Sequence, residues 1–274
     1  MQSFTPSDSP LGKESTYSSI YSPTLLFPIP REQSRQFLEN NIPLPFHGVD
    51  IWTGYEISWL NLKGKPEIAI GNFYFPANSP NLIESKSFKL YLNSLNQTRF
   101  KSAEELKNTL KNDLSIAANS PIDIDLLFPE EFKEFKPLFF KGNCLDHLDI
   151  EIDTYEINPS FLQVSDKLVE ESLYSHLLKS NCPVTGQPDW ASLFIHYKGF
   201  QINHAGLLKY IISFRNHQGF HEQCVESIFY TILKKCQPTH LTVYARYTRR
   251  GGLDINPFRS NFENSPSNFP MTRQ

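Results

Sequence analysis

The turn Gly64-Lys65-Pro66-Glu67 occurs a second time as Gly186-Gln187-Pro188-Asp189, and this repetition is the strongest indication of the fold. Both copies share a glycine, a proline two residues later and an acid directly after the proline. Each turn runs into an apolar stretch typical of a strand, Glu67–Phe75 in the first copy and Trp190–Tyr197 in the second. We expect the first turn to close a hairpin.

The spacing of later motifs supports a duplication. Lys89 precedes Phe100 by the same separation as Lys209 precedes Phe220. These correspondences keep their order along the chain, so we predict that a unit of roughly 120 residues occurs twice.

The clearest helix of the first copy begins at Ser102, because Glu105 follows at the spacing of a capping box. Leucines then recur every four positions on one face of this helix. These are Leu106, Leu110 and Leu114. Residues 122–126 alternate apolar residues with aspartate, which predicts a half-exposed strand.

The second copy has a matching apolar stripe at helical spacing, and Pro238 ends this helix. The stripe comprises Val225, Ile228, Phe229, Ile232 and Cys236. A closing strand alternates over residues 243–248. We therefore predict the α+β class, with antiparallel sheets backed by paired helices, twice over.

Composition divides the chain into four predicted parts. Residues 1–45 are rich in Ser, Pro and Thr and are interpreted as an N-terminal arm, partly anchored by Leu25–Phe27. Residues 46–140 form the first module and residues 141–259 the second, and residues 260–274 form a C-terminal tail.

The overall composition excludes some functions. Apolar residues make up 39% of the chain, enough to form a core, and the net charge of −3 is too small to favour a nucleic-acid or membrane partner. No signal-peptide pattern or long apolar stretch is visible. The four cysteines are far apart and form no metal or redox pair, so we expect a cytoplasmic protein with free thiols and no metal.

Cys182 is the strongest candidate for chemistry. It lies in residues 180–189, where two prolines and a glycine predict a rigid loop. Asp189 follows seven residues later, where the loop becomes strand, and is in a position to face the thiol. Cysteine is a strong nucleophile when a partner sets its ionisation. Local sequence leaves both interpretations open, a catalytic thiol or an inert loop cysteine.

His221 and Glu222 precede the second-copy helix and are able to exchange a proton and accept hydrogen bonds. Alternatively, they are an exposed histidine and a first-turn acid that the helix dipole favours. Cys224 and Cys236 lie on or beside the apolar stripe and are predicted to be core residues. Cys144 is interpreted as a surface-loop residue.

Two stretches are candidates for binding phosphate. If a helix begins near Ser85 and Lys86, its N–H groups and positive charge would favour an anion. Residues 246–252 carry the densest basic cluster and end in two glycines. Solvated charges are the alternative for both. No dinucleotide-binding glycine motif or P-loop is present.

Four motifs together resemble the signature of the 7-cyano-7-deazaguanine reductases. They are residues 84–91 (Glu-Ser-Lys-Ser-Phe-Lys-Leu-Tyr), 182–189 (Cys-Pro-Val-Thr-Gly-Gln-Pro-Asp), 220–222 (Phe-His-Glu) and 247–252 (Tyr-Thr-Arg-Arg-Gly-Gly). The resemblance implies tandem tunnelling-fold (T-fold) modules. In the short form of the family each module carries both the Glu-Ser-Lys and the Cys/Asp motifs. Here the two motifs are divided between modules, so a working site would need both halves to meet, and the family resemblance implies a homodimer.

The implied reaction reduces the nitrile of 7-cyano-7-deazaguanine to 7-aminomethyl-7-deazaguanine with two NADPH, in tRNA queuosine biosynthesis. By resemblance, Cys182 forms a thioimide with the nitrile carbon, Asp189 donates the proton and His221 assists. The implied substrate contacts are Ile83, Glu84, Ser85, His221 and Glu222. The implied NADPH contacts are Ser85, Lys86, Arg250 and Gly251.

Three other functions compete with this one. A cysteine hydrolase would use Cys182 with His221 and Asp189, but it would not need the basic residues. A metal-dependent T-fold cyclohydrolase would need a Cys/His ligand set, whereas the histidines here are scattered. A non-catalytic purine-binding module would bind the base without forming an adduct on the cysteine.

Overall fold

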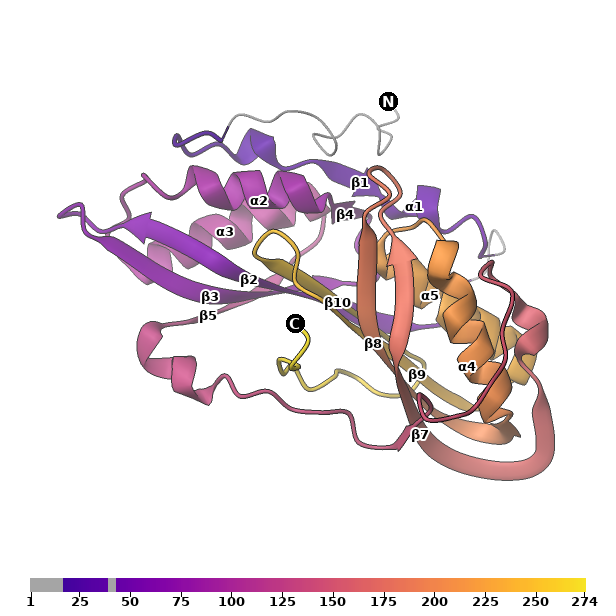
Figure 1. The fold of residues 1–274 in the computed structure, drawn as a ribbon. Helices are drawn as coiled ribbons and strands as arrows, with labels where there is room; N and C mark the ends of the chain where they lie inside the picture. The colour runs from indigo at the N-terminus through magenta and orange to yellow at the C-terminus, as the bar shows by residue number, and fades with distance from the viewer. Residues whose placement is uncertain (1–16, 39–42) are drawn as a thin grey trace. The chain divides into compact units, whose positions relative to one another are not determined.

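The computed structural model describes residues 17–38 and 43–274 (Figure 1). Within these residues the chain divides into two units. Unit 1 contains the residues up to Arg35, then Asp50–Lys136 and Arg249–Ile255. Unit 2 contains Gln36–Val49, Pro137–Thr248 and Asn256–Gln274. The predicted arm partly falls on residues 1–16 and 39–42, outside the described residues, and the predicted module boundaries stay a prediction.

Unit 1 contains a sheet with the strand order β5-β3-β2-β10. The strands are β2 (His47–Leu60), β3 (Pro66–Pro76), β5 (Asp123–Leu127) and the start of β10 (Leu253–Ser260). Two helices, α2 (Ser85–Ser94) and α3 (Ala103–Ala118), lie on one face of this sheet (Figure 1). The short strands β1 (Pro28–Pro30) and β4 (Asn81–Ile83) pair antiparallel beside them, and α1 (Arg31–Ser34) follows β1.

Helix α3 forms for the predicted reasons. The Ser102 side chain accepts a hydrogen bond from the Glu105 N–H at 3.2 Å and caps the helix. The Glu105 carboxylate, however, accepts from the N–H of Lys101 at 2.7 Å, one residue before the cap. The predicted leucine stripe, which includes Leu106 and Leu110, is completely buried in the core of unit 1. The predicted helix and its apolar face are therefore confirmed.

Unit 2 repeats this plan with the strand order β10-β9-β8-β7-β6. Its strands are β6 (Asn143–Cys144), β7 (Val164–Asn181), β8 (Pro188–Ile202), β9 (His240–Tyr247) and the remainder of β10. All neighbours from β7 to β10 pair antiparallel, and only the short β6 pairs parallel. Helices α4 (His204–Ile212) and α5 (His221–Cys236) pack against β7, β8 and β9.

The remaining short 3-10 turns are η2 (Pro23–Leu25), η3 (Pro129–Glu134), η4 (Pro159–Phe161) and η5 (Ser213–Asn216). In both units two long strands precede two helices, and the strand after the second helix pairs with the second long strand. The predicted α+β class and its duplication are confirmed.

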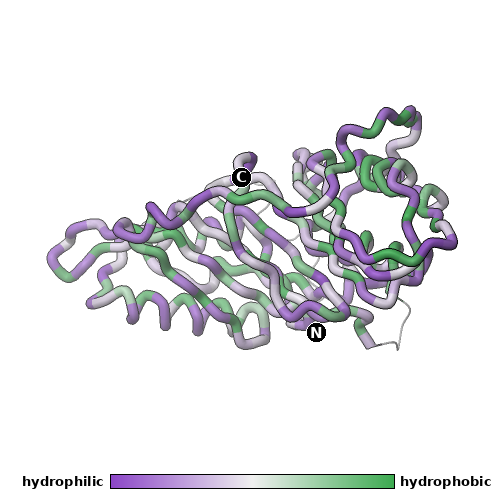
Figure 2. The backbone as a smooth tube through the Cα atoms, turned by 90° about the horizontal axis from the view of Figure 1, so that it is seen from below, coloured by the Kyte–Doolittle hydropathy of each residue, from purple (hydrophilic) through white to green (hydrophobic). Residues whose placement is uncertain are grey.

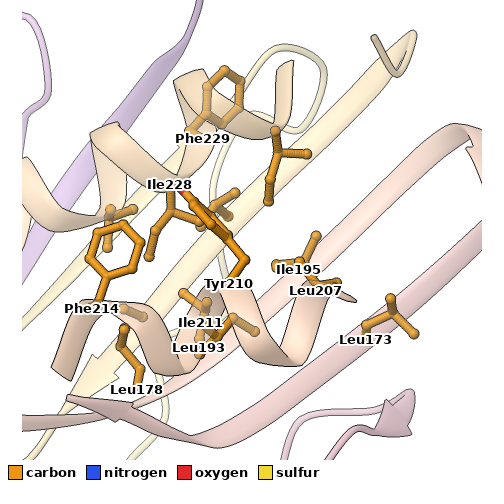
Figure 3. Close-up of a cluster of buried hydrophobic side chains, with 14 of the residues drawn as sticks. Leu173, Leu178, Leu193, Ile195, Leu207, Tyr210, Ile211, Phe214, Ile228 and Phe229 are labelled. Atoms are coloured by element: carbon orange, nitrogen blue, oxygen red, sulfur yellow. The ribbon is translucent and has the colours of Figure 1, made fainter. Parts of the chain in front are cut away.

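The core of unit 2 lies between its helices and its strands. Figure 3 shows side chains of α4 and α5 directed toward those of β7 and β8. The labelled residues are Leu173, Leu178, Leu193, Ile195, Leu207, Tyr210, Ile211, Phe214, Ile228 and Phe229. Burying this much apolar surface is the main contribution to the stability of the unit.

The predicted closing strand is β9, but its alternating apolar and polar residues do not give one buried and one solvent-exposed face. Every residue from Leu241 to Tyr247 is buried. The helices cover one face, and the C-terminal residues cover part of the other, since Arg246 donates to Gln274 and Asn268. Figure 2 shows hydrophilic and hydrophobic residues interspersed along both units. Within the described residues no helix is long and apolar enough to cross a membrane.

Candidate active site

Cys182 lies in a tight loop between β7 and β8. Its N–H donates to the Gln187 carbonyl at 2.8 Å, and its own carbonyl accepts from the Gly186 N–H at 3.0 Å. Gly186 has φ +68°, which glycine adopts without strain. The loop is therefore closed by backbone hydrogen bonds. Cys182 is only 2% exposed, yet it belongs to none of the hydrophobic clusters.

The residue before Cys182 connects this loop to the start of α5. The Asn181 N–H donates to the His217 carbonyl at 2.8 Å, and the Asn181 carbonyl accepts from the Gly219 N–H at 3.1 Å. Because His221 follows two residues after Gly219, these two bonds hold the cysteine loop beside the beginning of the helix. The pairing brings together two of the predicted catalytic segments.

Asp189 and His221 contact each other in the interior of unit 2. Asp189 is the second residue of β8 and lies opposite Ser180 in the register of β7 and β8. Its Oδ2 is 3.3 Å from Nε2 of His221, and both side chains are more than nine-tenths buried. A carboxylate at this distance orients an imidazole for proton transfer. The structure thus places Asp189 beside a histidine that the motif also contains.

His221 also stacks on an aromatic ring. The imidazole lies 3.8 Å from the ring of Tyr247, centroid to centroid, with an interplanar angle of 10°. Its second nitrogen, Nδ1, is buried and has no hydrogen-bond partner among the described residues. The sequence motif includes Tyr247, but sequence reasoning gave it no role, since no local pattern indicates this stacking.

Helix α5 begins without a side-chain cap. The N-cap residue is Phe220, which has no polar side chain to accept from the first-turn N–H groups. Glu222 lies in that first turn and is buried, with 3% of its surface exposed. A carboxylate at the start of a helix is favoured by the helix dipole. Both predicted residues of this stretch, His221 and Glu222, are therefore buried rather than exposed.

The other cysteines differ from Cys182. The pKa of the Cys224 thiol is raised to about 12, chiefly by burial. The Tyr247 and Ser180 hydroxyls lower it in part, and the Asp189 charge adds to the rise. Burial also raises the pKa of Cys236 to about 11. Both remain neutral thiols near pH 7, so their predicted core role is confirmed. Cys144 is partly exposed at β6, and the described residues contain no His, Cys, Asp or Glu group suited to a metal.

In unit 1, Glu84 is the N-cap of α2. One carboxylate oxygen accepts from the Lys86 N–H and the other from the Ser87 N–H, both at 2.7 Å. Burial raises the pKa of Glu84, while these two N–H groups, the Ser85 hydroxyl and the Arg250 charge lower it. The sequence motif predicted a ligand contact here but missed the cap.

The predicted phosphate-binding residues also lie in unit 1. Ser85 and Lys86 begin α2, and Arg250 acts electrostatically on Glu84 at its N-terminus. Arg250 and Gly251 belong to the turn before β10, where Gly251 and Gly252 have φ +60° and +77°. A side chain at Gly252 would meet the Glu56 carboxyl at 2.4 Å. Glycine at this position therefore avoids a clash with Glu56 in the turn that carries the Arg250 charge.

Comparison with known proteins decides the family. A model described as the N-terminal part of the nitrile reductase 7-cyano-7-deazaguanine reductase matches residues 17–126, and one described as QueF-like protein matches residues 188–266. The NADPH-dependent 7-cyano-7-deazaguanine reductases of Burkholderia pseudomallei and Burkholderia mallei are each 57% identical over 98% of this chain and 99% of their own length. That of Burkholderia thailandensis is 56% identical over the same shares. This chain belongs to the 7-cyano-7-deazaguanine reductases.

Membership of the 7-cyano-7-deazaguanine reductases confirms the resemblance predicted from the sequence, together with the NADPH-dependent nitrile reductase class. Within each unit the structure gathers the predicted residues of the family. Unit 2 holds Cys182, Asp189, His221 and Glu222. Unit 1 holds Ile83, Glu84, Ser85, Lys86, Arg250 and Gly251. The individual role of each residue stays a prediction.

Proposed function

We propose that this chain reduces the nitrile of 7-cyano-7-deazaguanine to the primary amine 7-aminomethyl-7-deazaguanine, with NADPH as reductant and Cys182 as the covalent nucleophile. One observation supports this most directly. The closed Cys182 loop is bonded through Asn181 to the segment just before His221, and His221 contacts Asp189 at 3.3 Å. A nucleophile and a proton-transfer pair thus lie on neighbouring segments of one unit.

The first chemical step is addition of the Cys182 thiol across the carbon–nitrogen triple bond. The sulfur forms a bond to the nitrile carbon, and the thiol proton passes to the nitrile nitrogen, which gives a thioimide. Asp189 carries that proton, and His221 orients the carboxylate and assists. After the adduct is reduced, its carbon–sulfur bond breaks, and the sulfur leaves as the thiol with an imine remaining for the second reduction.

In each of the two reductions, bound NADPH would supply a hydride to the carbon, and a proton from solvent would be added to the nitrogen. The residues that we propose to hold it fit a phosphate-bearing cofactor. Lys86 and Arg250 provide positive charge, and the turn at Gly251 allows backbone to approach a ligand closely. A side chain at Gly251 would approach the Lys89 stem at 3.2 Å, so glycine leaves room there.

The base of the substrate presents adjacent N–H groups, which carboxylates accept well. We assign this contact to Glu222 in unit 2 and Glu84 in unit 1, with Ile83 and Ser85 beside Glu84. Glu84 already accepts two backbone N–H groups, and its oxygens keep further lone pairs for a ligand. That both sets act on one substrate stays a prediction, as do the homodimer, the cytoplasmic location and the place in tRNA queuosine biosynthesis.

Mass spectrometry tests the proposal. The protein is incubated with 7-cyano-7-deazaguanine in the absence of NADPH, and the peptide that contains Cys182 should gain one substrate mass. Cys182→Ala should lose both this adduct and the consumption of NADPH, whereas Cys144→Ala, the matched control, should keep both. An adduct on any other cysteine contradicts the proposal. Release of ammonia without NADPH would indicate a cysteine hydrolase instead.

A further inference from the structure

The imidazole of His221 is held between two neighbouring strands of unit 2. Asp189 on β8 contacts its edge, and Tyr247 on β9 covers its face. Ala191 on β8 pairs directly with Tyr247. Since Asp189 and Ala191 are two residues apart, their side chains and that of Tyr247 point to the same side of the sheet. The strand register therefore sets both contacts at once.

Tyr247 is itself rigidly held. It is completely buried, its N–H donates to Asn256 at 3.2 Å, and its carbonyl accepts from Gln274 at 3.0 Å. Its hydroxyl lies near the side chains of Cys224 and Ser180, and burial raises its pKa well above 10. The phenol therefore stays protonated near neutral pH and is a poor candidate for proton exchange. The ring face is the part of Tyr247 that His221 meets.

Polar contacts fix the His221 ring at one nitrogen only, within the part of the chain that the structure describes. Asp189 contacts Nε2, and Nδ1 has no hydrogen-bond partner there. A single contact to Nε2 permits the imidazole to swing about that contact, and a parallel ring at 3.8 Å prevents this movement.

We infer that Tyr247 is a positioning residue, whose ring face holds the His221 imidazole in the plane that directs Nε2 at Asp189. The inference rests on the proposed function for its kinetic consequence only, because the orientation of His221 can be measured without substrate. Misplacing a proton-transfer group by about 1 Å can lower a rate about 10²-fold. Loss of the ring should therefore lower kcat, to which proton transfer by His221 contributes.

Three variants separate the ring from the hydroxyl and from general core damage. Tyr247→Leu removes the flat face, and Tyr247→Phe keeps it while removing the hydroxyl. Tyr210→Leu is the matched control, because Tyr210 is an equally buried tyrosine of the same core and its ring makes an edge-to-face contact with Phe214. Both residues are labelled in Figure 3. If Tyr247→Leu does not fold, Tyr247→Met fills the same space with a flexible, non-planar chain.

The decisive measurement is the ¹⁵N spectrum of the histidine rings, which reports the nitrogen that carries the proton. The signals of His221, among eight histidines, are assigned by their loss in His221→Gln. The parent should show one tautomer, protonated at Nε2. Tyr247→Leu should mix tautomers and lower kcat about 10²-fold. Tyr247→Phe, which keeps the ring, should keep the single tautomer and most of the kcat of the parent. Tyr210→Leu should change neither the tautomer nor kcat.

An unchanged tautomer and kcat in Tyr247→Leu would overturn the inference. So would a loss in Tyr247→Phe as large as in Tyr247→Leu, since that result would assign the effect to the hydroxyl. If the parent protein does not reduce the nitrile at all, the proposed function is wrong, and the ¹⁵N measurement still decides whether Tyr247 holds His221.

Discussion

The turn between β2 and β3 and the turn between β7 and β8 occupy the same place in the two units, yet their acids have different partners. In unit 1 the Glu67 carboxylate accepts from the Asn61 side-chain amide at 3.1 Å. The Asn61 side-chain oxygen in turn accepts from the backbone N–H groups of Lys63 and Lys65 within the turn. In unit 2 Asp189 contacts His221 of α5. One acid therefore stabilises its own turn, whereas the other contacts a histidine on a distant helix.

The second helices of the units differ in a similar way. Helix α3 is capped by Ser102, but α5 has Phe220 at its N-cap position and no side-chain cap. An N-cap contributes about 1 kcal/mol. Where α3 has its cap and first turn, α5 presents His221 and Glu222. At this position unit 1 has a local stabilising cap, whereas unit 2 has two buried titratable side chains.

Replacing the acid of each turn by its amide should give the largest difference in kcat between the two units. Asp189→Asn keeps the shape but removes the charge that contacts His221, so we expect kcat to fall about 10²–10⁴-fold. Glu67→Gln is the matched control in unit 1, and its kcat should stay near that of the parent. Steady-state NADPH oxidation with the nitrile measures both. Equal losses in the two variants would show that the turns do not differ in function.

Charge pairs of the two units should differ in their contribution to stability. In unit 2 Arg259 donates to Glu226 at 2.7 Å and 3.0 Å, and both side chains are almost completely buried. Glu226→Ala leaves a buried charge and should cost about 3–5 kcal/mol of unfolding free energy. Lys111→Ala breaks the exposed contact with Asp123 in unit 1 and should cost at most about 1 kcal/mol. Urea unfolding followed by circular dichroism compares the two losses, and similar values would contradict this ranking.

Features that depend on neighbouring residues were predictable from the sequence. The cap at Ser102, the apolar stripe of α5 and the closed loop at Cys182 each follow from spacing within a short segment. The duplication was also predictable, because the turn and the lysine-to-phenylalanine spacing recur in order.

Features that depend on pairing between distant segments were not predicted. Strand β7 was not assigned, because its apolar residues, including Leu168 and Leu173, do not alternate strictly. Strand β10 contains Pro257, which is uncommon inside a sheet. The stacking of Tyr247 on His221 depends on the register of β8 and β9. No property of either residue alone indicates it.

Removing the cap of α3 should have a smaller effect on stability than removing the buried charge pair. Ser102→Ala removes the side-chain acceptor for the Glu105 N–H and should destabilise unit 1 by about 1 kcal/mol. The reciprocal change, Phe220→Ser, places a side-chain acceptor at the N-cap of α5. The resulting change in stability measures what the absence of a cap costs this helix. Thermal unfolding of both variants gives these values. A stable Ser102→Ala variant would mean that the cap contributes nothing to α3.

The smallest effect concerns Glu84, the acid that caps α2. Burial outweighs the helix N–H groups and raises the pKa of Glu84 above its ordinary 4.5 in the folded protein. The folded state therefore binds this proton more tightly than the unfolded state, and the resulting stability is complete below pH 4.5 and is lost as the pH rises through the raised pKa. Glu84→Gln stays neutral, so the melting-temperature difference from the parent should change across that window. A constant difference for Glu84→Gln would mean that the helix N–H groups fully offset burial at this carboxylate.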